Sequence, residues 1–206
     1  MRGTLIALSV AGASLFAAAP AFADTALFAG GCFWSVESNF DKVDGVTATI
    51  SGFAGGHVEN PSYEQVVFED TGHYEVVEIE YDPEVVSFEQ LLTVFWHTTD
   101  PTDAGGQFCD RGDGYRTAVF ALTPEQRDVA EASKAALGEE TGLTIVTEIK
   151  EAAPFYAAED YHQDFHTNNP ERYEAYRVGC GRDIRINELW GDQAFLGTSD
   201  NPFPEG

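Results

Sequence analysis

The sequence is poor in basic residues and in cysteine, and each shortage narrows what the protein can do. Only 11 of its 206 residues are lysine or arginine, against 35 aspartates and glutamates, which gives a formal net charge of −24. Nucleic acid and anionic membranes repel a chain this acidic, so neither is expected as a partner. Three cysteines are too few, and odd in number, for a purely structural disulfide scaffold. At least one cysteine is therefore expected to be unpaired or to exchange partners.

Long apolar runs are also scarce, and the clearest one lies at the start of the chain. Met1-Arg2 precedes an apolar, alanine-rich segment from Leu5 to Pro20, and Ala21-Phe22-Ala23 follows it. This order predicts a secretory signal peptide over residues 1–23, with an uncleaved anchor as the alternative. Cleavage would leave 206 − 23 = 183 residues, which suits one domain. We expect an exported protein, located in the periplasm because the signal has no lipobox cysteine, and free of the membrane after cleavage.

The remaining sequence predicts one α/β domain over residues 24–198 and a flexible tail over 199–206. Apolar or alternating runs predict strands at 26–29, 46–52, 74–81, 116–122 and 144–151. Capping patterns and helical spacing predict helices that begin near 33, 62, 87, 123, 158 and 169, the fifth covering 158–166. Residues 98–114 have no periodicity and are expected to form a functional loop. Several connections are too short for parallel crossovers, so we expect a two-layer sandwich with a mixed sheet.

A glycine turn carries the cysteine of greatest interest. Gly30-Gly31-Cys32 follows a predicted strand, and an apolar stripe at helical spacing begins directly after it (Phe33, Val36, Phe40 and Val43). Cys32 is therefore expected at a helix N-terminus, where free N–H groups and the helix dipole lower the pKa of a thiol. Trp34 lies about 100° off the stripe, so core packing does not account for it. The alternative is a buried apolar helix start without chemistry.

One acidic residue lies on the apolar face of its predicted strand. Glu75 alternates with Val77, Ile79 and Tyr81, which places it on the side of the core. Desolvation there favours the protonated carboxyl and makes Glu75 a candidate proton donor. The alternative is a glutamate at the end of a strand that reaches solvent.

These residues belong to a series of motifs that resembles the A-type peptide methionine sulfoxide reductases. The motifs occur in the family's order from about Ala26 to Pro170: Gly31-Cys32-Phe33-Trp34 with Glu37, Gly52-Phe53-Ala54-Gly55-Gly56, Asn60-Pro61-Ser62-Tyr63, Thr71-Gly72-His73-Tyr74-Glu75, Tyr81-Asp82-Pro83, Phe95-Trp96, Asp100-Pro101, Asp110 with Tyr115-Arg116, and Phe155-Tyr156 with Ala158-Glu159-Asp160. The resemblance implies a ferredoxin-like α/β sandwich with additional helices and loops. It also implies an enzyme that binds neither a metal nor a cofactor.

The resemblance assigns the chemistry to two residues. Cys32 would attack the sulfoxide sulfur as a thiolate, and Glu75 would protonate the departing oxygen, so that reduced methionine leaves and Cys32 becomes a sulfenic acid. The family is selective for the S epimer of the sulfoxide. The implied substrate is oxidised methionine, in proteins or free, and the implied activity is that of a peptide-methionine (S)-S-oxide reductase.

Five residues would bind the substrate. Phe33 and Trp34 would form the apolar pocket for the S-methyl group. Tyr63, Asp110 and Tyr115 would bond the sulfoxide oxygen or orient the acid, with Tyr63 helping in proton transfer. All five assignments are carried over by position from the family.

Recycling of the sulfenic acid needs a second thiol and an external reductant. Cys180 has glycines on both sides, which gives it the mobility of a resolving thiol, and it is favoured for that role. Cys109, next to Asp110, is the alternative, and a Cys109–Cys180 bridge that serves as a second relay or as a staple is the third option. A thioredoxin-like protein is the expected electron donor, and the enzyme is expected to be a monomer.

Two other functions fit parts of the sequence. A thiol peroxidase or peroxide sensor would also form a sulfenic acid at Cys32, although the cysteine lacks the proline and threonine neighbours of peroxiredoxins. A non-enzymatic acidic binding domain would be expected to have an even number of cysteines and no buried Glu75. His162 and His166 could share a helix face as zinc ligands do, but no third ligand accompanies them at a suitable spacing.

Overall fold

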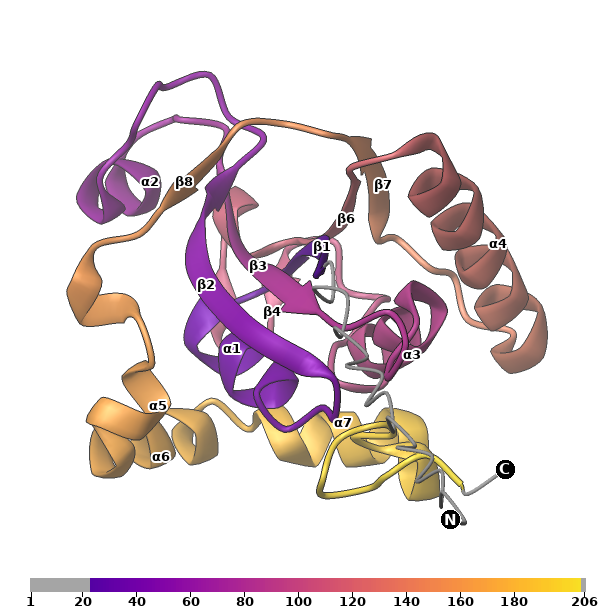
Figure 1. Cartoon of the computed structure of the whole chain (residues 1–206). Coiled ribbons are helices and arrows are strands. Elements are labelled where there is room, and N and C mark those ends of the chain that lie inside the picture. The colour runs from indigo at the N-terminus through magenta and orange to yellow at the C-terminus, as the bar shows by residue number, and fades with distance from the viewer. Residues whose placement is uncertain (1–22, 205–206) are drawn as a thin grey trace, which may run out of the picture.

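The structure, a computed structural model, describes residues 23–204 and is built on a six-stranded mixed sheet (Figure 1). The strand order is β7-β6-β1-β3-β2-β8, and every neighbouring pair is antiparallel except β6 and β7. The strands are β1 (Asp24–Gly30), β2 (Val46–Ala54), β3 (Tyr74–Tyr81), β6 (Thr117–Ala121), β7 (Glu148–Glu151) and β8 (Phe155–Ala157). A separate hairpin pairs β4 (Gly106–Gln107) with β5 (Asp110–Arg111) inside the predicted loop. The predicted signal peptide lies, apart from Ala23, outside the described residues.

The central part of the sheet has a ferredoxin-like topology. The chain runs β1, α1 (Phe33–Phe40), β2, β3, α3 (Phe88–His97) and β6, and these four strands lie in the order β6-β1-β3-β2. This βαββαβ arrangement confirms the predicted fold class. The additional helices are α2 (Tyr63–Phe68), α4 (Pro124–Thr141), α5 (Phe165–Asn168), α6 (Pro170–Gly179) and α7 (Arg182–Trp190).

Local capping sets the starts of the predicted helices. Ser62 and Ser87 each accept a hydrogen bond from a backbone N–H three residues on, and complete capping boxes with Gln65 and Gln90. The Thr123 side chain accepts a hydrogen bond from the N–H of Gln126 at the start of α4, which has a proline in its first turn. Such caps satisfy N–H groups that a helix leaves free, so these sequence signals suffice to place α2, α3 and α4.

The main core lies on the sheet face that α1 and α3 cover. Phe28 of β1 contacts Phe40 of α1 and Phe95 of α3, with ring centroids 5.5 Å and 5.1 Å apart. All three rings are fully buried, and burial of each stabilises the fold by about 1.5–3 kcal/mol. The opposite face carries a smaller cluster around Phe120. The sheet therefore fixes β1 and α1 firmly, together with the turn that joins them.

The segment from 155 to 168 differs from the prediction of a helix over 158–166. Residues Asp160–His162 form one turn of 3₁₀ helix, and α5 begins only at Phe165, after Asp164 adopts a left-handed conformation (φ 51°). Gln163 holds this path, because its side chain bonds both the N–H and the carbonyl of Ser51 in β2 at 2.9 Å. Tertiary hydrogen bonds thus replace helical ones here. His162 and His166 consequently do not share a helix face.

The last described residues run back along the domain. The N–H of Ser199 donates to the Lys42 carbonyl at 2.8 Å, and the Lys42 ammonium lies 2.7 Å from the Asp200 carboxylate. The flexibility predicted for 199–206 stays a prediction. Between residues 23 and 204, no helix is long and apolar enough to cross a bilayer.

Candidate active site

The turn between β1 and α1 places Cys32 at the base of the helix. Gly31 has φ +84°, and a Cβ at this position would lie 2.5 Å from the Cβ of Gln107. Glycine is therefore required on both conformational and steric grounds. Cys32 occupies the N-cap of α1, its side chain forms no capping hydrogen bond, and it is only 7% exposed. The predicted position of Cys32 is confirmed.

Glu75 lies directly beside this turn, although 43 positions separate it from Cys32 in the sequence. The N–H of Phe33, the first residue of α1, donates to Glu75 Oε2 at 2.9 Å. Glu75 is 2% exposed and belongs to β3, where its register partner in β2 is Phe53. The Glu75 backbone is therefore fixed by the β2–β3 pairing, and its carboxyl is fixed by the hydrogen bond from the first turn of α1. The inward direction predicted for Glu75 is confirmed.

Burial keeps both groups protonated at neutral pH. It raises the pKa of Glu75 to about 8, and the hydrogen bond from Phe33 lowers it less than burial raises it. Burial also raises the pKa of the Cys32 thiol, and the neighbouring Glu75 raises it further. The predicted lowering of the Cys32 pKa is therefore wrong: the first turn of α1 does not offset the cost of removing a thiolate from water.

Trp34 leaves the apolar stripe because a separate set of side chains holds it. Its indole N–H donates to His162 Nδ1 at 3.1 Å, and its ring stacks on Phe165 with centroids 3.7 Å apart and planes 6° apart. The edge of Tyr176 meets it at 5.8 Å. Burial lowers the pKa of His162 to about 4, so the imidazole is neutral and its Nδ1 can accept. Trp34 itself stays half-buried.

Phe33 is buried more deeply than Trp34. It is 1% exposed, and its ring lies 4.9 Å from the His162 ring and 6.3 Å from the Tyr63 ring, centroid to centroid. His162 therefore joins both aromatic residues of the predicted methyl pocket.

Two tyrosines flank Glu75 from other elements. Tyr63 opens α2, and its N–H donates to Glu159 Oε1 at 3.0 Å. Tyr115 ends a 3₁₀ turn in the loop that the sequence left without periodicity. Burial, and after it the charge of Glu75, raises the pKa of Tyr63 to about 12 and raises that of Tyr115 as well. Both hydroxyls therefore keep their protons and are available as hydrogen-bond donors.

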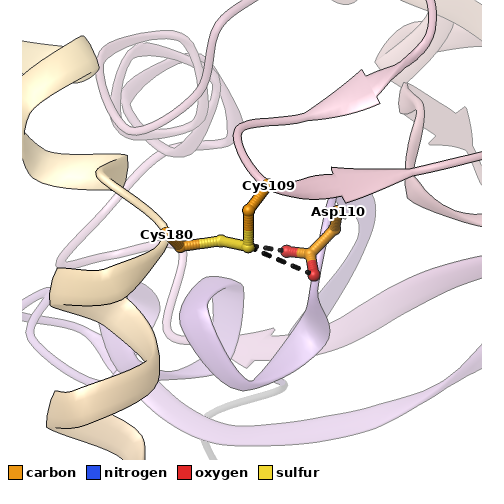
Figure 2. Close-up of side chains that lie close together, drawn as sticks. All are labelled: Cys109, Asp110 and Cys180. Atoms are coloured by element: carbon orange, nitrogen blue, oxygen red, sulfur yellow. Dashed lines mark hydrogen bonds between the residues drawn. A yellow bond between two sulfur atoms is a disulfide. The ribbon is translucent and has the colours of Figure 1, made fainter.

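Asp110 lies between the site and the other two cysteines. The Tyr176 hydroxyl donates to Asp110 Oδ2 at 2.5 Å, and hydrogen bonding to Tyr176 also lowers the pKa of Cys32. Cys109 and Cys180 form a disulfide, and the two sulfur atoms lie 3.8 Å and 3.7 Å from the Asp110 carboxylate (Figure 2). Cys32 is the free cysteine. The structure shows the third pairing considered above, with Cys109 exposed and Cys180 half-buried.

Arg182 is a site residue that the sequence did not predict. It is fully buried, and its guanidinium donates to the carbonyl of Gly30 at 3.3 Å and lies 4.2 Å from the centre of the Phe108 ring. Burial raises the pKa of both Cys32 and Asp110, and the charge of Arg182 offsets part of that rise. Arg182 is the first residue of α7, where it shares the buried face of the helix with Ile186 and Trp190. Only the packing of α7 against the β1–α1 turn reveals it.

The arrangement of these groups defines a class of protein. A buried cysteine on a strand–helix turn lies beside a protonated carboxyl and two tyrosine hydroxyls, and an accessible cysteine pair lies next to the same site. A thiol, a proton donor and a dithiol in one place are the parts of a thiol-dependent oxidoreductase.

Comparison with known proteins identifies the family. The sequence model of the peptide methionine sulfoxide reductase family matches residues 24–194. The chain is 53% identical to MsrA 2 of Rhizobium meliloti, with 84% of this chain and 87% of that protein covered. It is 49% identical to MsrA 2 of Caulobacter vibrioides, with 93% and 100% covered. The chain belongs to the peptide methionine sulfoxide reductase family, and the resemblance seen in the sequence is confirmed.

Solved structures agree with this assignment. Reduced Mxr1 from Saccharomyces cerevisiae matches with a TM-score of 0.69 at 30% identity, and covers 74% of this chain and 89% of its own. Methionine sulfoxide reductase A of Corynebacterium diphtheriae matches with a TM-score of 0.64 at 33% identity, with 74% and 77% covered. Mxr1 in its complex with Trx2 shares the fold, with a TM-score of 0.51 at 22% identity and 73% and 90% covered.

Proposed function

We propose that this protein is a peptide-methionine (S)-S-oxide reductase that repairs oxidised methionine in exported proteins. The observation that carries the proposal is the coupling of Cys32 to Glu75, whose carboxyl lies 2.9 Å from the N–H that follows the cysteine. Membership of the family supports the reaction, and the S-epimer selectivity is taken from the family.

The reaction balances without any further reactant. The Cys32 sulfur attacks the sulfoxide sulfur, and Glu75 gives its proton to the oxygen. The proton of the thiol replaces the one that Glu75 gives away, so that the net transfer is from thiol to oxygen. The hydroxyl then passes from the substrate sulfur to the Cys32 sulfur, while the substrate sulfur–oxygen bond and the transient bond between the two sulfurs break. The methionine sulfur gains the two electrons that Cys32 loses, so that reduced methionine leaves and Cys32 becomes a sulfenic acid. A carboxyl with a pKa of about 8 suits this exchange, because it is a proton donor at neutral pH and also a competent acceptor.

The surrounding residues bind and orient the sulfoxide. Phe33 and Trp34 form the wall for the S-methyl group, with Trp34 fixed by His162 and Phe165. Tyr63 and Tyr115 donate to the sulfoxide oxygen as negative charge develops on it. Asp110 acts through Tyr176, which it holds by a short hydrogen bond at the side of Cys32.

In the recycling steps, oxidation passes from the buried Cys32 to the half-buried Cys180 and then to the exposed Cys109. Cys180, half-buried beside Asp110, attacks the Cys32 sulfenic acid and releases water. Cys109 then attacks the Cys180 sulfur, which returns Cys32 to its thiol and leaves the Cys109–Cys180 disulfide of the structure. The exposed Cys109 sulfur is the one that an external dithiol reaches. We assign that role to a thioredoxin-like protein outside the cytoplasm, in line with the complex of Mxr1 and Trx2.

A quenched single-turnover experiment tests both the reaction and the order of sulfurs. The reduced enzyme is mixed with a peptide that contains methionine-(S)-sulfoxide, alkylated at successive times and mapped by mass spectrometry. We expect one equivalent of methionine per enzyme and a first disulfide between Cys32 and Cys180. A first disulfide that lacks Cys180 would overturn the assigned order. Faster turnover of hydrogen peroxide than of the sulfoxide would favour a peroxidase instead.

The place of action is tested separately. The predicted signal peptide supports export to the periplasm, and N-terminal sequencing of the protein from a periplasmic fraction is expected to begin at Asp24. Recovery of the full chain from the cytoplasm would contradict export without affecting the chemistry.

A further inference from the structure

Glu37 is a buried carboxylate that the proposed chemistry does not use. It lies on α1, is 0% exposed, and neither of its oxygens makes a hydrogen bond of standard geometry. Burial raises the pKa of Glu37 to about 7, and the nearby backbone N–H groups of Asp164 and Phe165 offset only part of this rise. A buried polar group without full compensation is costly, and an apolar side chain of similar size would pack here at a lower cost.

The position of Glu37 relates it to the aromatic wall of the site. Trp34 and Glu37 are three residues apart on α1, so they lie on the same side of the helix. Phe165 lies against both of them: its ring stacks on Trp34 at 3.7 Å, and its N–H faces the Glu37 carboxylate. One residue of α5 is thus held at two points by residues of α1.

The turn before α5 needs such support. Asp164 adopts the left-handed conformation, which aspartate tolerates better than most residues with a side chain, and its own carboxylate does not cap α5. The charged and titratable groups that surround Glu37 are Asp41 and Asp164, with His166 bonded to Asp41 at 3.2 Å. Because the two aspartates repel Glu37, an ion pair does not explain why an acid is placed here.

We propose that Glu37 is a positioning residue for the substrate pocket. Its carboxyl lies against the backbone N–H groups of the Asp164–Phe165 turn and keeps the Phe165 ring parallel to Trp34, so that the wall facing the sulfoxide methyl group is formed before substrate binds. This role depends on the proposed function, because it takes Trp34 as a wall of the substrate pocket.

The first test separates binding from turnover. Glu37→Leu removes the acceptor, and we expect KM for a methionine-(S)-sulfoxide peptide to rise about tenfold while kcat changes less than about twofold. Glu37→Gln keeps one acceptor oxygen and is expected to raise KM only about threefold. Phe40→Leu is the matched control, since Phe40 is equally buried on α1 but packs against Phe28 of the core. It is expected to lower the stability and to leave KM unchanged.

A double-mutant cycle shows whether Glu37 acts through Phe165. In a Phe165→Ala background, neither Glu37→Leu nor Glu37→Gln is expected to raise KM further. If the KM effects multiply instead, or if Glu37→Gln and Glu37→Leu leave KM at the wild-type value, the positioning role is wrong. Should Glu37→Leu not fold, Glu37→Gln in the two backgrounds decides by itself.

The failure of this inference can be told from failure of the proposed pocket. Trp34→Ala tests the pocket directly and is expected to raise KM. If Trp34→Ala leaves KM unchanged, the assignment of the substrate wall fails. If Trp34→Ala raises KM and the Glu37 variants do not, only the positioning role fails.

Discussion

The two cysteine regions of this protein are built in opposite ways. Cys32 is 7% exposed, at the end of a strand in the middle of the sheet, and its partner Glu75 is 2% exposed. Cys109 is exposed in the small β4–β5 hairpin and is joined to Cys180 between two additional helices (Figure 2). Burial raises the pKa of both groups in the first region, whereas the second keeps a sulfur accessible to solvent.

The difference matches what each step needs. Proton transfer between a thiol, a carboxyl and a small substrate gains from a dry and rigid site, where each electrostatic interaction is strong. Disulfide exchange with another protein needs a sulfur that the attacking thiol can reach in line. The chain combines a dry site with an accessible disulfide by placing Cys32 in the turn between β1 and α1, and the other two cysteines in segments outside the central sheet.

The largest expected effect is at the buried region. Cys32→Ser is expected to lower kcat/KM for a methionine-(S)-sulfoxide peptide by about 10⁴-fold or more, because a serine hydroxyl is a far weaker nucleophile toward the sulfoxide sulfur. Steady-state release of reduced methionine measures this. The variant should keep the Cys109–Cys180 disulfide, and full activity in it would remove Cys32 from the mechanism.

The second effect concerns the proton donor. Glu75→Gln is expected to lower the single-turnover rate constant by about 10²–10³-fold, as for loss of a general acid. In the wild type this constant should fall as pH rises through about 8, where Glu75 loses its proton, and the variant should lack that decline. Rapid-quench measurements from pH 6 to pH 10 check both points. A decline of equal size in the variant would assign the proton to another group.

The third effect is on stability and uses the same residue. Because the pKa of Glu75 is about 8 in the folded protein and 4.5 ordinarily, the folded state holds the proton more tightly. Glu75 therefore stabilises the fold most at low pH, and this contribution is lost as pH rises from about 4.5 to about 8, amounting to up to about 5 kcal/mol. Urea unfolding at pH 5 and pH 9 is expected to show a smaller loss for Glu75→Gln than for wild type. Equal losses would contradict the raised pKa.

The smallest effect belongs to the exposed region. The Cys109–Cys180 disulfide closes a long stretch of chain, with a sequence separation of 71, so its reduction is expected to lower the free energy of unfolding by about 2–4 kcal/mol. Urea unfolding with and without a reductant measures this, and Cys32→Ser is the control that keeps the disulfide. An equal change in Cys109→Ser would show that the reductant acts elsewhere.

Local signals predicted the elements that carry the buried site. The glycine turn and the apolar stripe predicted α1. The alternation around Glu75 predicted β3 and the inward direction of the Glu75 side chain. The capping serines gave α2 and α3. The motifs around Cys32 and Glu75 also gave the family. In each case the cause lies within a few residues of the chain, which is why it can be read there.

Three features could not be read locally. Gln163 bonds to β2 and removes the helix expected over 158–166. Arg182 and Tyr176 reach the site from α7 and α6, and no local signal shows that either helix packs beside Cys32. The pKa of Cys32 rises because packing removes water from it, a cost that outweighs the helix terminus on which the prediction was based.

The sequence by itself determined which residues can react, where the sheet places Cys32 and Glu75, and the family to which the chain belongs, because these depend on residue type, spacing and order. The tertiary structure decided that Cys109 joins Cys180, that Phe165 and His162 hold Trp34, and that burial keeps Cys32 and Glu75 protonated. Those outcomes depend on distances between distant segments and on the exclusion of water, and neither exists until the chain has folded.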